Sequence, residues 1–295
     1  MKADLNLELV FKGADSSLGV INFYDIAKAL VGFERTISLT NHLLLNGEVI
    51  TQSPSASGFE LLLSPPEIGS WKAIAGIVFG TALTVGVASK DSALGYLSAS
   101  ALDYVIQQAL GFHVDFDSTL GEQLEEAKKD KIIENNLSED RFDSLIEKVE
   151  PSLKDCHRPI VFSETATNAQ INWSTARGQG KLDGFFDAET YDYISATVRD
   201  KNLDEFTGAI SSYNVNTFKG RIYIDSMNRT IPFELGDLAR NARSAAMIVA
   251  SMYENTSRMN TFAKYVTLRG FRNESKNDRL KSLFVVEVSA SGKIK

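Results

Sequence analysis

The chain has little of the chemistry from which disulfide and metal sites are built. Among 295 residues there are one cysteine, Cys156, and three histidines. A single cysteine excludes an internal disulfide framework, and no Cys/His cluster has the spacing of a structural zinc site. Cys156 precedes His157, but adjacent side chains diverge, so we interpret the thiol as inert and His157 as a turn residue before Pro159.

Motifs for nucleotide binding and hydrolysis are also missing. The sequence contains no G-x-x-x-x-G-K-[ST] loop, no G-x-S-x-G turn, no H-E-x-x-H pair and no G-x-G-x-x-G after a predicted strand. With six prolines and 43% apolar residues, the chain is neither collagen-like nor generally disordered. We therefore expect a folded protein with no cofactor and no enzymatic activity.

One long uncharged run interrupts an otherwise ordinary polar pattern. Residues 73–89 carry no charge for 17 positions and are bracketed by Lys72 and Lys90. A membrane-spanning helix needs about 20 apolar residues. We expect a buried hairpin or core helix here, with a membrane segment or an oligomer contact as alternatives. The charged N-terminus does not resemble a signal peptide, so we expect a cytoplasmic protein without a membrane anchor.

The charge is acidic overall and unevenly distributed. Thirty-one Lys and Arg face 38 Asp and Glu, a net charge of −7, which argues against a dedicated nonspecific DNA binder. Residues 115–155 carry 13 acidic and six basic residues, whereas residues 256–295 carry nine basic and three acidic ones. Opposite charges at the two ends suit subunits that meet head to tail, so we expect a homo-oligomer without direct contact to nucleic acid.

Periodicity predicts both strands and helices. Alternating leucines predict a strand at 5–11. Asn22 and Gly47 are suited to begin and end a helix over 23–46. The apolar residues that recur in it at helical spacing are Phe23, Ile26, Ala27, Leu30, Val31, Phe33 and Ile37. The other predicted helices are 93–110, 122–131, 138–155 and 235–254, and the other predicted strands are 49–51, 59–63, 206–213, 218–224, 262–272 and 283–288.

The predicted fold class is α+β. It has an N-terminal strand–helix–strand unit, a helical middle, and a mixed, strand-rich C-terminal domain around one helix. The glycine-rich segment 178–184 is interpreted as a flexible joint. The predicted parts are therefore an α+β domain at 1–112, an acidic helical segment with a linker at 113–184, and an α+β domain at 185–295.

The best local arrangement for catalysis is His113, Asp115 and Asp117. In an extended strand these three side chains share one side and could hold a divalent metal with open positions for water. A half-buried strand with a solvated polar face is the simpler interpretation, and we favour it.

Two groups of residues are candidates for partner binding. Tyr191 and Tyr193 follow the glycine-rich segment, and aromatic residues beside a mobile loop are typical interface anchors, although core packing is the commoner role. Arg269, Arg272 and Arg279 lie on a basic stretch, around a predicted hairpin tip, that could grip phosphate or an acidic protein. A solvated loop is the simpler interpretation of that stretch.

Six blocks of sequence together resemble a known family. They are FYDIAKALVGFERTISLTNHLLLNGEVIT at 23–51, PPEIGSWK at 65–72, LGFHVDFD at 110–117, SSYNVNTFKGRIYI at 211–224, RTIPFEL at 229–235 and RLKSLF at 279–284. The chain resembles, almost end to end, a family of uncharacterised bacterial and phage proteins of similar length, and within it the phage-encoded Gabija anti-defence proteins. That resemblance implies a non-enzymatic immune-evasion protein that binds, as a large oligomer, a bacterial nuclease–ATPase complex and prevents it from binding or cutting DNA. No contact residues of the family can be matched to positions here.

Two other functions remain open from the residues alone. The first is a membrane-associated defence or effector subunit that uses residues 73–89. The second is a metal-dependent hydrolase centred on His113, Asp115 and Asp117.

Overall fold

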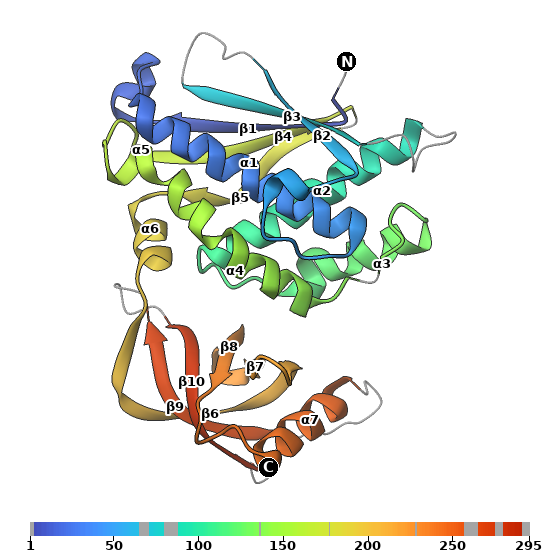
Figure 1. Ribbon diagram of the computed structural model, residues 1–295, viewed down its shortest axis with the longest axis vertical. Coiled ribbons are helices and arrows are strands. Elements are labelled where there is room, and N and C mark those ends of the chain that lie inside the picture. The colour runs from blue at the N-terminus through green and yellow to red at the C-terminus, as the bar shows by residue number, and fades with distance from the viewer. Residues whose placement is uncertain are drawn as a thin grey trace. The chain divides into compact units, whose positions relative to one another are not determined.

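The computed structural model confirms the α+β class and divides the chain into two compact units, Met1–Ile194 and Ser195–Lys295 (Figure 1). It describes residues 3–64, 71–79, 88–135, 137–176, 178–227, 229–256, 265–274 and 280–290.

The first unit is built on a five-stranded antiparallel sheet with the order β2-β3-β1-β4-β5. The strands are β1 (Leu5–Lys12), β2 (Phe59–Ser64), β3 (Lys72–Phe79), β4 (Asn168–Thr175) and β5 (Gln179–Phe186). The first strand of the chain is therefore the central strand of the sheet. Its alternating leucines, Leu5, Leu7 and Leu9, are fully buried, as their period predicts.

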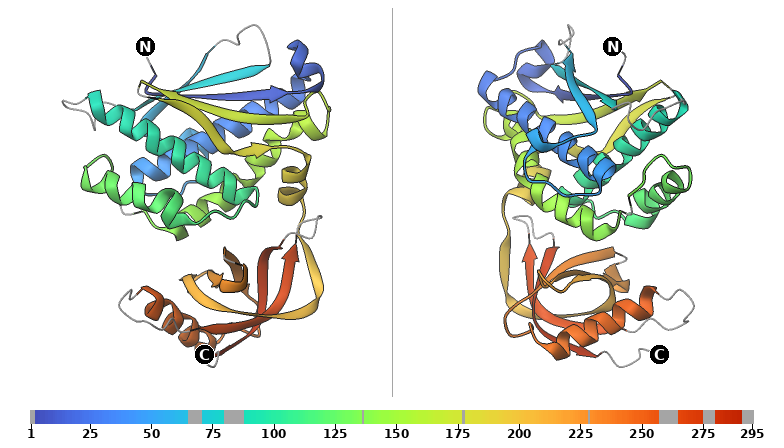
Figure 2. Two further views of the ribbon diagram at one scale, coloured as in Figure 1. Left: turned by 180° about the vertical axis from the view of Figure 1, so that it is seen from behind. Right: turned by 45° about the vertical axis from the view of Figure 1, so that its right-hand side comes forward.

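Helices cover one face of this sheet in two layers (Figure 2). Next to the strands lie α1 (Phe23–Asn46) and α2 (Ala88–Ala109), and α4 (Glu139–Cys156) packs on both of them. The shorter helices are α3 (Glu122–Lys129), α5 (Arg158–Val161) and α6 (Ala188–Ser195). Buried side chains from the sheet and all three long helices form one hydrophobic core.

Helix α1 begins and ends where the sequence predicts, but it buries fewer of its apolar residues than their helical spacing predicts. Asn22 Oδ1 accepts a hydrogen bond from the Asp25 N–H at 3.1 Å, and Gly47 ends the helix with φ 71°. Of the apolar residues at helical spacing, Ile26, Phe33 and Ile37 are buried, whereas Phe23, Ala27 and Val31 are exposed. The helix therefore presents a second, apolar face to solvent.

The uncharged run at 73–89 is not one continuous helix. Residues 73–79 lie in β3, a largely buried strand between β1 and β2, and residues 80–87 lie outside the described part of the chain. A single helix over the whole run, whether in the core or in a membrane, is therefore excluded. Among the residues that the structure describes, no helix is both long and apolar enough to span a membrane. Residues 49–51, predicted as a strand, form none.

The glycine-rich segment 178–184 is strand β5 rather than a flexible joint. Its glycines allow close packing: a Cβ at Gly180 would lie 2.9 Å from Trp173 Nε1, and one at Gly184 would lie 2.6 Å from Ile106 Cγ2. Because β4 and β5 complete the sheet, residues 113–184 belong to the first unit. The division between units falls after Ile194, ten residues beyond the predicted joint.

The second unit is a closed five-stranded barrel with the order β10-β8-β7-β6-β9 (Figure 2). Its strands are β6 (Val198–Asn214), β7 (Lys219–Ile224), β8 (Arg229–Leu235), β9 (Val266–Glu274) and β10 (Leu280–Ala290). The one helix, α7 (Ala242–Thr256), follows β8 and packs against β6 and β10. It begins later than predicted, because residue 235 ends β8. The parallel pairing of β8 with β10 closes the barrel, which gives it the topology of an OB fold.

His157 lies at the turn between α4 and α5, as its position before Pro159 predicts, but its side chain is buried in the core. It has no solvent exposure, and its Nδ1 lies 2.7 Å from the Leu153 carbonyl oxygen, which can only accept. Nδ1 therefore carries the proton, and Nε2 accepts from Thr190 Oγ1 at 3.0 Å. Burial lowers the pKa of His157 to about 4, so the ring is neutral in the folded protein at pH 7.

Acid should therefore destabilise the protein through this one residue. Below pH 6.5, the ordinary pKa of histidine, His157 is protonated in the unfolded chain but stays neutral in the folded chain down to about pH 4. The free energy of unfolding therefore falls between about pH 6.5 and pH 4, by about 3 kcal/mol in total. Urea denaturation across this range should show that fall in the wild type and a correspondingly smaller one in His157→Gln. Parallel curves for the two proteins would contradict the assignment.

Candidate interaction surface

An exposed apolar surface lies at the start of α1. Large side chains from the segment before the helix, from its first turn and from the end of α5 are more than half exposed, with Phe23 at 86% and Leu18 at 83%. We call this set the α1 surface; it consists of Leu18, Val20, Phe23, Tyr24 and Phe162. Soluble proteins seldom gather so many large apolar groups on one face unless another molecule covers them.

A shallow apolar cavity adjoins the α1 surface. It has a volume of about 430 Å³ and lies between residues 19–21, the α1 residues Phe23 and Ala27, and Trp71. Trp71 is held by an edge-to-face contact with the buried Phe11 ring, with the ring centroids 5.8 Å apart. The surface therefore offers a hollow as well as projecting side chains, which is the shape that a partner's apolar side chain needs.

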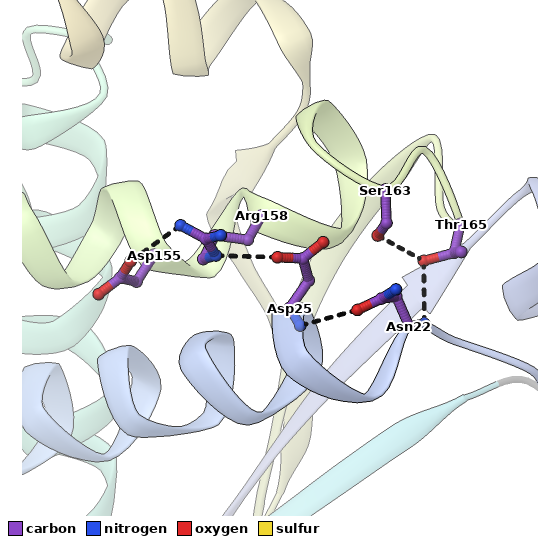
Figure 3. Close-up of polar contacts among 6 residues, drawn as sticks. All are labelled: Asn22, Asp25, Asp155, Arg158, Ser163 and Thr165. Atoms are coloured by element: carbon purple, nitrogen blue, oxygen red, sulfur yellow. Dashed lines mark hydrogen bonds and ion pairs between the residues drawn. The ribbon is translucent and has the colours of Figure 1, made fainter.

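Arg158 is fixed beside the Tyr24 and Phe162 rings of this surface, and Figure 3 shows the carboxylates that hold it. Its Nε donates to Asp25 Oδ1 at 2.9 Å, and its Nη1 lies 4.0 Å from Asp155 Oδ1. Its guanidinium carbon lies 4.5 Å from the Phe162 ring centroid and 5.2 Å from that of Tyr24. The ion pair and the two cation–π contacts hold an arginine and two aromatic rings in place before any partner binds.

A second set of polar contacts attaches the segment before α1 to the loop after α5 (Figure 3). Thr165 Oγ1 accepts from the Asn22 N–H at 3.4 Å and lies 3.1 Å from Ser163 Oγ. The Ser16 N–H donates to the Thr165 carbonyl oxygen at 2.8 Å. These bonds position Val20 and Phe23 relative to Phe162, although about 140 residues separate them in sequence.

The two predicted tyrosines lie in different environments. Tyr191 is half-buried, and its ring contacts Phe162 with the centroids 5.9 Å apart, so it lies at the edge of the α1 surface. Tyr193 is buried against Gly111, and its hydroxyl lies 3.3 Å from His113 Nε2. Tyr193 is therefore placed for core packing and not for contact with a partner.

The predicted basic stretch is engaged within the barrel where it is described. Arg269 pairs with Glu287 at 3.4 Å, and Arg272 pairs with Glu274 at 2.9 Å. Arg279 lies outside the described residues, as does most of the predicted hairpin tip. Both described arginines therefore have carboxylate partners within the barrel.

The candidate metal residues do not form a strand. His113 has φ 53°, and Asp115 Oδ1 accepts from the Ser118 N–H at 2.8 Å at the start of a π-helical turn, Asp117–Gly121. The alternation that would place three side chains on one side is therefore absent, and the strand prediction is wrong. Within the ranges that the structure describes, no three His, Cys, Asp or Glu side chains come close enough to hold a metal ion.

Two family models match the chain and together cover most of it. Residues 7–195 match a domain of unknown function (DUF7946), and residues 202–289 match a family of unknown function (DUF7947). The chain belongs to the DUF7946 family. The limit between the two matched regions agrees with the limit between the two structural units. Neither a curated protein nor a solved structure matches the chain.

The α1 surface was not predicted from the sequence, but the sequence contains a signal for it. Apolar residues occupy positions 23, 24, 26, 27, 29, 30, 31 and 33, which is more than one face of a helix can bury. Arg158 and Phe162 carry no comparable signal, because only the tertiary fold brings them next to Tyr24.

The support beneath the α1 surface can be tested with two carboxylates that contact the same arginine. Asp25→Ala leaves the partly buried Arg158 without its close partner and should cost about 2 kcal/mol of unfolding free energy. Asp155→Ala removes a longer, more exposed contact and should cost less than about 0.5 kcal/mol. Equal losses for the two variants in urea denaturation would contradict this assignment.

Proposed function

We propose that this protein is a non-enzymatic binding protein that acts by covering part of a partner protein. The observation that carries the proposal is the α1 surface, where the exposed rings of Tyr24 and Phe162 contact an arginine that is already fixed in place. Aromatic and arginine side chains dominate the binding energy of protein interfaces. Preorganisation also lowers the entropy lost when such side chains are immobilised on binding.

We further propose that the partner is a bacterial anti-phage nuclease complex of the Gabija type, bound in the host cytoplasm by a homo-oligomer of this chain. The support for this finer step is the sequence resemblance to Gabija anti-defence proteins. The acidic segment 115–155 adds an electrostatic argument, because exposed acids on α3, such as Glu122 and Glu126, would be attracted to the basic DNA-binding groove of a nuclease.

Changes on the α1 surface should weaken binding without unfolding the protein. Phe23→Ala combined with Phe162→Ala removes two exposed rings, so the unfolding free energy should change by less than about 1 kcal/mol. The dissociation constant of the purified complex should rise about thirtyfold or more, because a buried aromatic anchor is worth about 2 kcal/mol. A multivalent oligomer can mask a single loss, which is why both rings are changed.

The matched control for this double variant is Tyr253→Ala on α7. Tyr253 is a large aromatic side chain with 70% exposure, but it lies in the barrel unit. Its removal should leave affinity within about threefold of wild type. Equal effects of the double variant and the control would contradict a role for the α1 surface.

The mechanism itself can be tested by titration. If the protein acts by contact, inhibition of the nuclease should rise with the inhibitor-to-target ratio and saturate near a fixed stoichiometry. Complete inhibition by a small fraction of one equivalent would show turnover and would contradict the proposal.

A further inference from the structure

We infer that a cavity in the first unit binds a linear polyamine, which is a short alkyl chain that carries two or more ammonium groups. This inference goes beyond the proposed function and does not depend on it. The cavity has a volume of about 410 Å³ and is bounded by α2, by α3 with the turn after it, and by the end of β4. Its lining combines aromatic rings, carboxylates and apolar side chains, and an alkylammonium ligand can contact all three favourably.

Two aromatic rings line the cavity and meet at nearly a right angle. Tyr96 on α2 and Trp173 on β4 are in edge-to-face contact, with ring centroids 5.5 Å apart and ring planes at 84°. Tyr96 is 52% exposed, so a ligand can reach it. The face of an aromatic ring carries negative partial charge and attracts an ammonium group that lies over it.

Two carboxylates of the same helical segment also line the cavity, Glu126 and Asp130. The Asp130 N–H donates to the Glu126 carbonyl oxygen at 2.9 Å, so the two residues lie one helical turn apart. Their Cβ atoms are therefore about 6 Å apart. Two ammonium groups joined by four carbons span about the same distance. In the part of the chain that the structure describes, neither carboxylate has an ion-pair partner, so both are available to a cationic ligand.

The remaining lining also favours a donor with an alkyl chain. Gln123 lines the cavity, and its Nε2 donates to the Thr119 carbonyl oxygen at 2.8 Å. Its Oε1 is buried and has no hydrogen-bond partner among the described residues, and an ammonium N–H that reached this oxygen would satisfy it. Leu97, Ala127 and Ile132 supply apolar surface for the carbon chain between the ammonium groups.

The test is a titration of the full chain with spermidine at low salt, followed by the fluorescence of Trp173. The chain has two tryptophans, so Trp71→Phe leaves Trp173 as the only reporter, and calorimetry on the wild type gives the affinity without that change. We expect saturable binding with a dissociation constant of about 1 mM or lower, weakened by added salt. No saturable signal by either method up to about 10 mM would overturn the inference.

Other ligands define the chemistry that the cavity recognises. Putrescine, which has two ammonium groups, should bind, whereas butanediol, which has the same carbon chain without the charges, should not. Binding of Mg²⁺ in place of spermidine would show a metal site. Tighter binding of N-acetyl-lysine amide than of spermidine would show that a protein side chain is the ligand. Either result, or equal binding of butanediol and putrescine, would overturn the assignment.

Matched double variants on α3 locate the site. Glu126→Gln with Asp130→Asn removes the two cavity carboxylates at nearly constant volume and should weaken spermidine binding about tenfold. Glu122→Gln with Glu125→Gln removes the same charge from exposed residues that do not line the cavity, and should leave affinity within about twofold. Equal losses in the two pairs would show general charge attraction and contradict a site in the cavity.

The ring contact has its own conservative control. Tyr96→Leu keeps an apolar side chain but removes the aromatic ring, so affinity should fall about threefold. Tyr96→Phe keeps the ring and should bind spermidine as the wild type does. Because Tyr96 is largely exposed, both variants should fold. A loss in Tyr96→Phe as large as that in Tyr96→Leu would contradict the cation–π contact.

Discussion

The pairing of β1 with β4 is the constraint on which the first unit depends. It joins the start of the chain to a strand that begins about 160 residues later, with Leu7 opposite Trp173 and Leu9 opposite Ile171. Because β1 pairs with β3 on its other edge, this contact places the first strand at the centre of the sheet. The long helices between these strands then fold back over one face of the sheet, which is how α4 and α5 come to lie beside α1.

The α1 surface forms because α4 and α5 lie beside the start of α1. The end of α4 and the start of α5 bring Arg158 to the first turn of α1, where Asp25 is almost fully buried and ready to pair with it. The exposed rings of Tyr24 and Phe162 then both contact a fixed guanidinium group. Polar contacts that stabilise the fold thus also hold an apolar surface in one conformation, which is what recognition by contact requires.

Signals between neighbouring residues were enough to predict most helices and strands. Contacts between residues far apart in the sequence determined the features that could not be predicted. The Asn22 cap, the Gly47 stop, the period of β1 and the strands around α7 depend on neighbouring residues, so they were predictable. The segment 178–184 was wrongly predicted as a flexible joint, because its glycines instead leave space for the side chains of Trp173 and Ile106, which belong to other elements. Likewise, helical spacing shows that α1 is amphipathic but not which apolar residues a partner must cover, and Arg158 becomes a site residue only through Asp25.

The central claim is that the α1 surface is the region that touches the partner. The most direct measurement is photocrosslinking in cells, with a photoreactive phenylalanine analogue at position 23 and, for comparison, at position 253 on α7, both being exposed aromatic positions. We expect a strong crosslink from position 23 to a subunit of the nuclease complex and little crosslinking from position 253. A strong crosslink from 253 with none from 23 would contradict it.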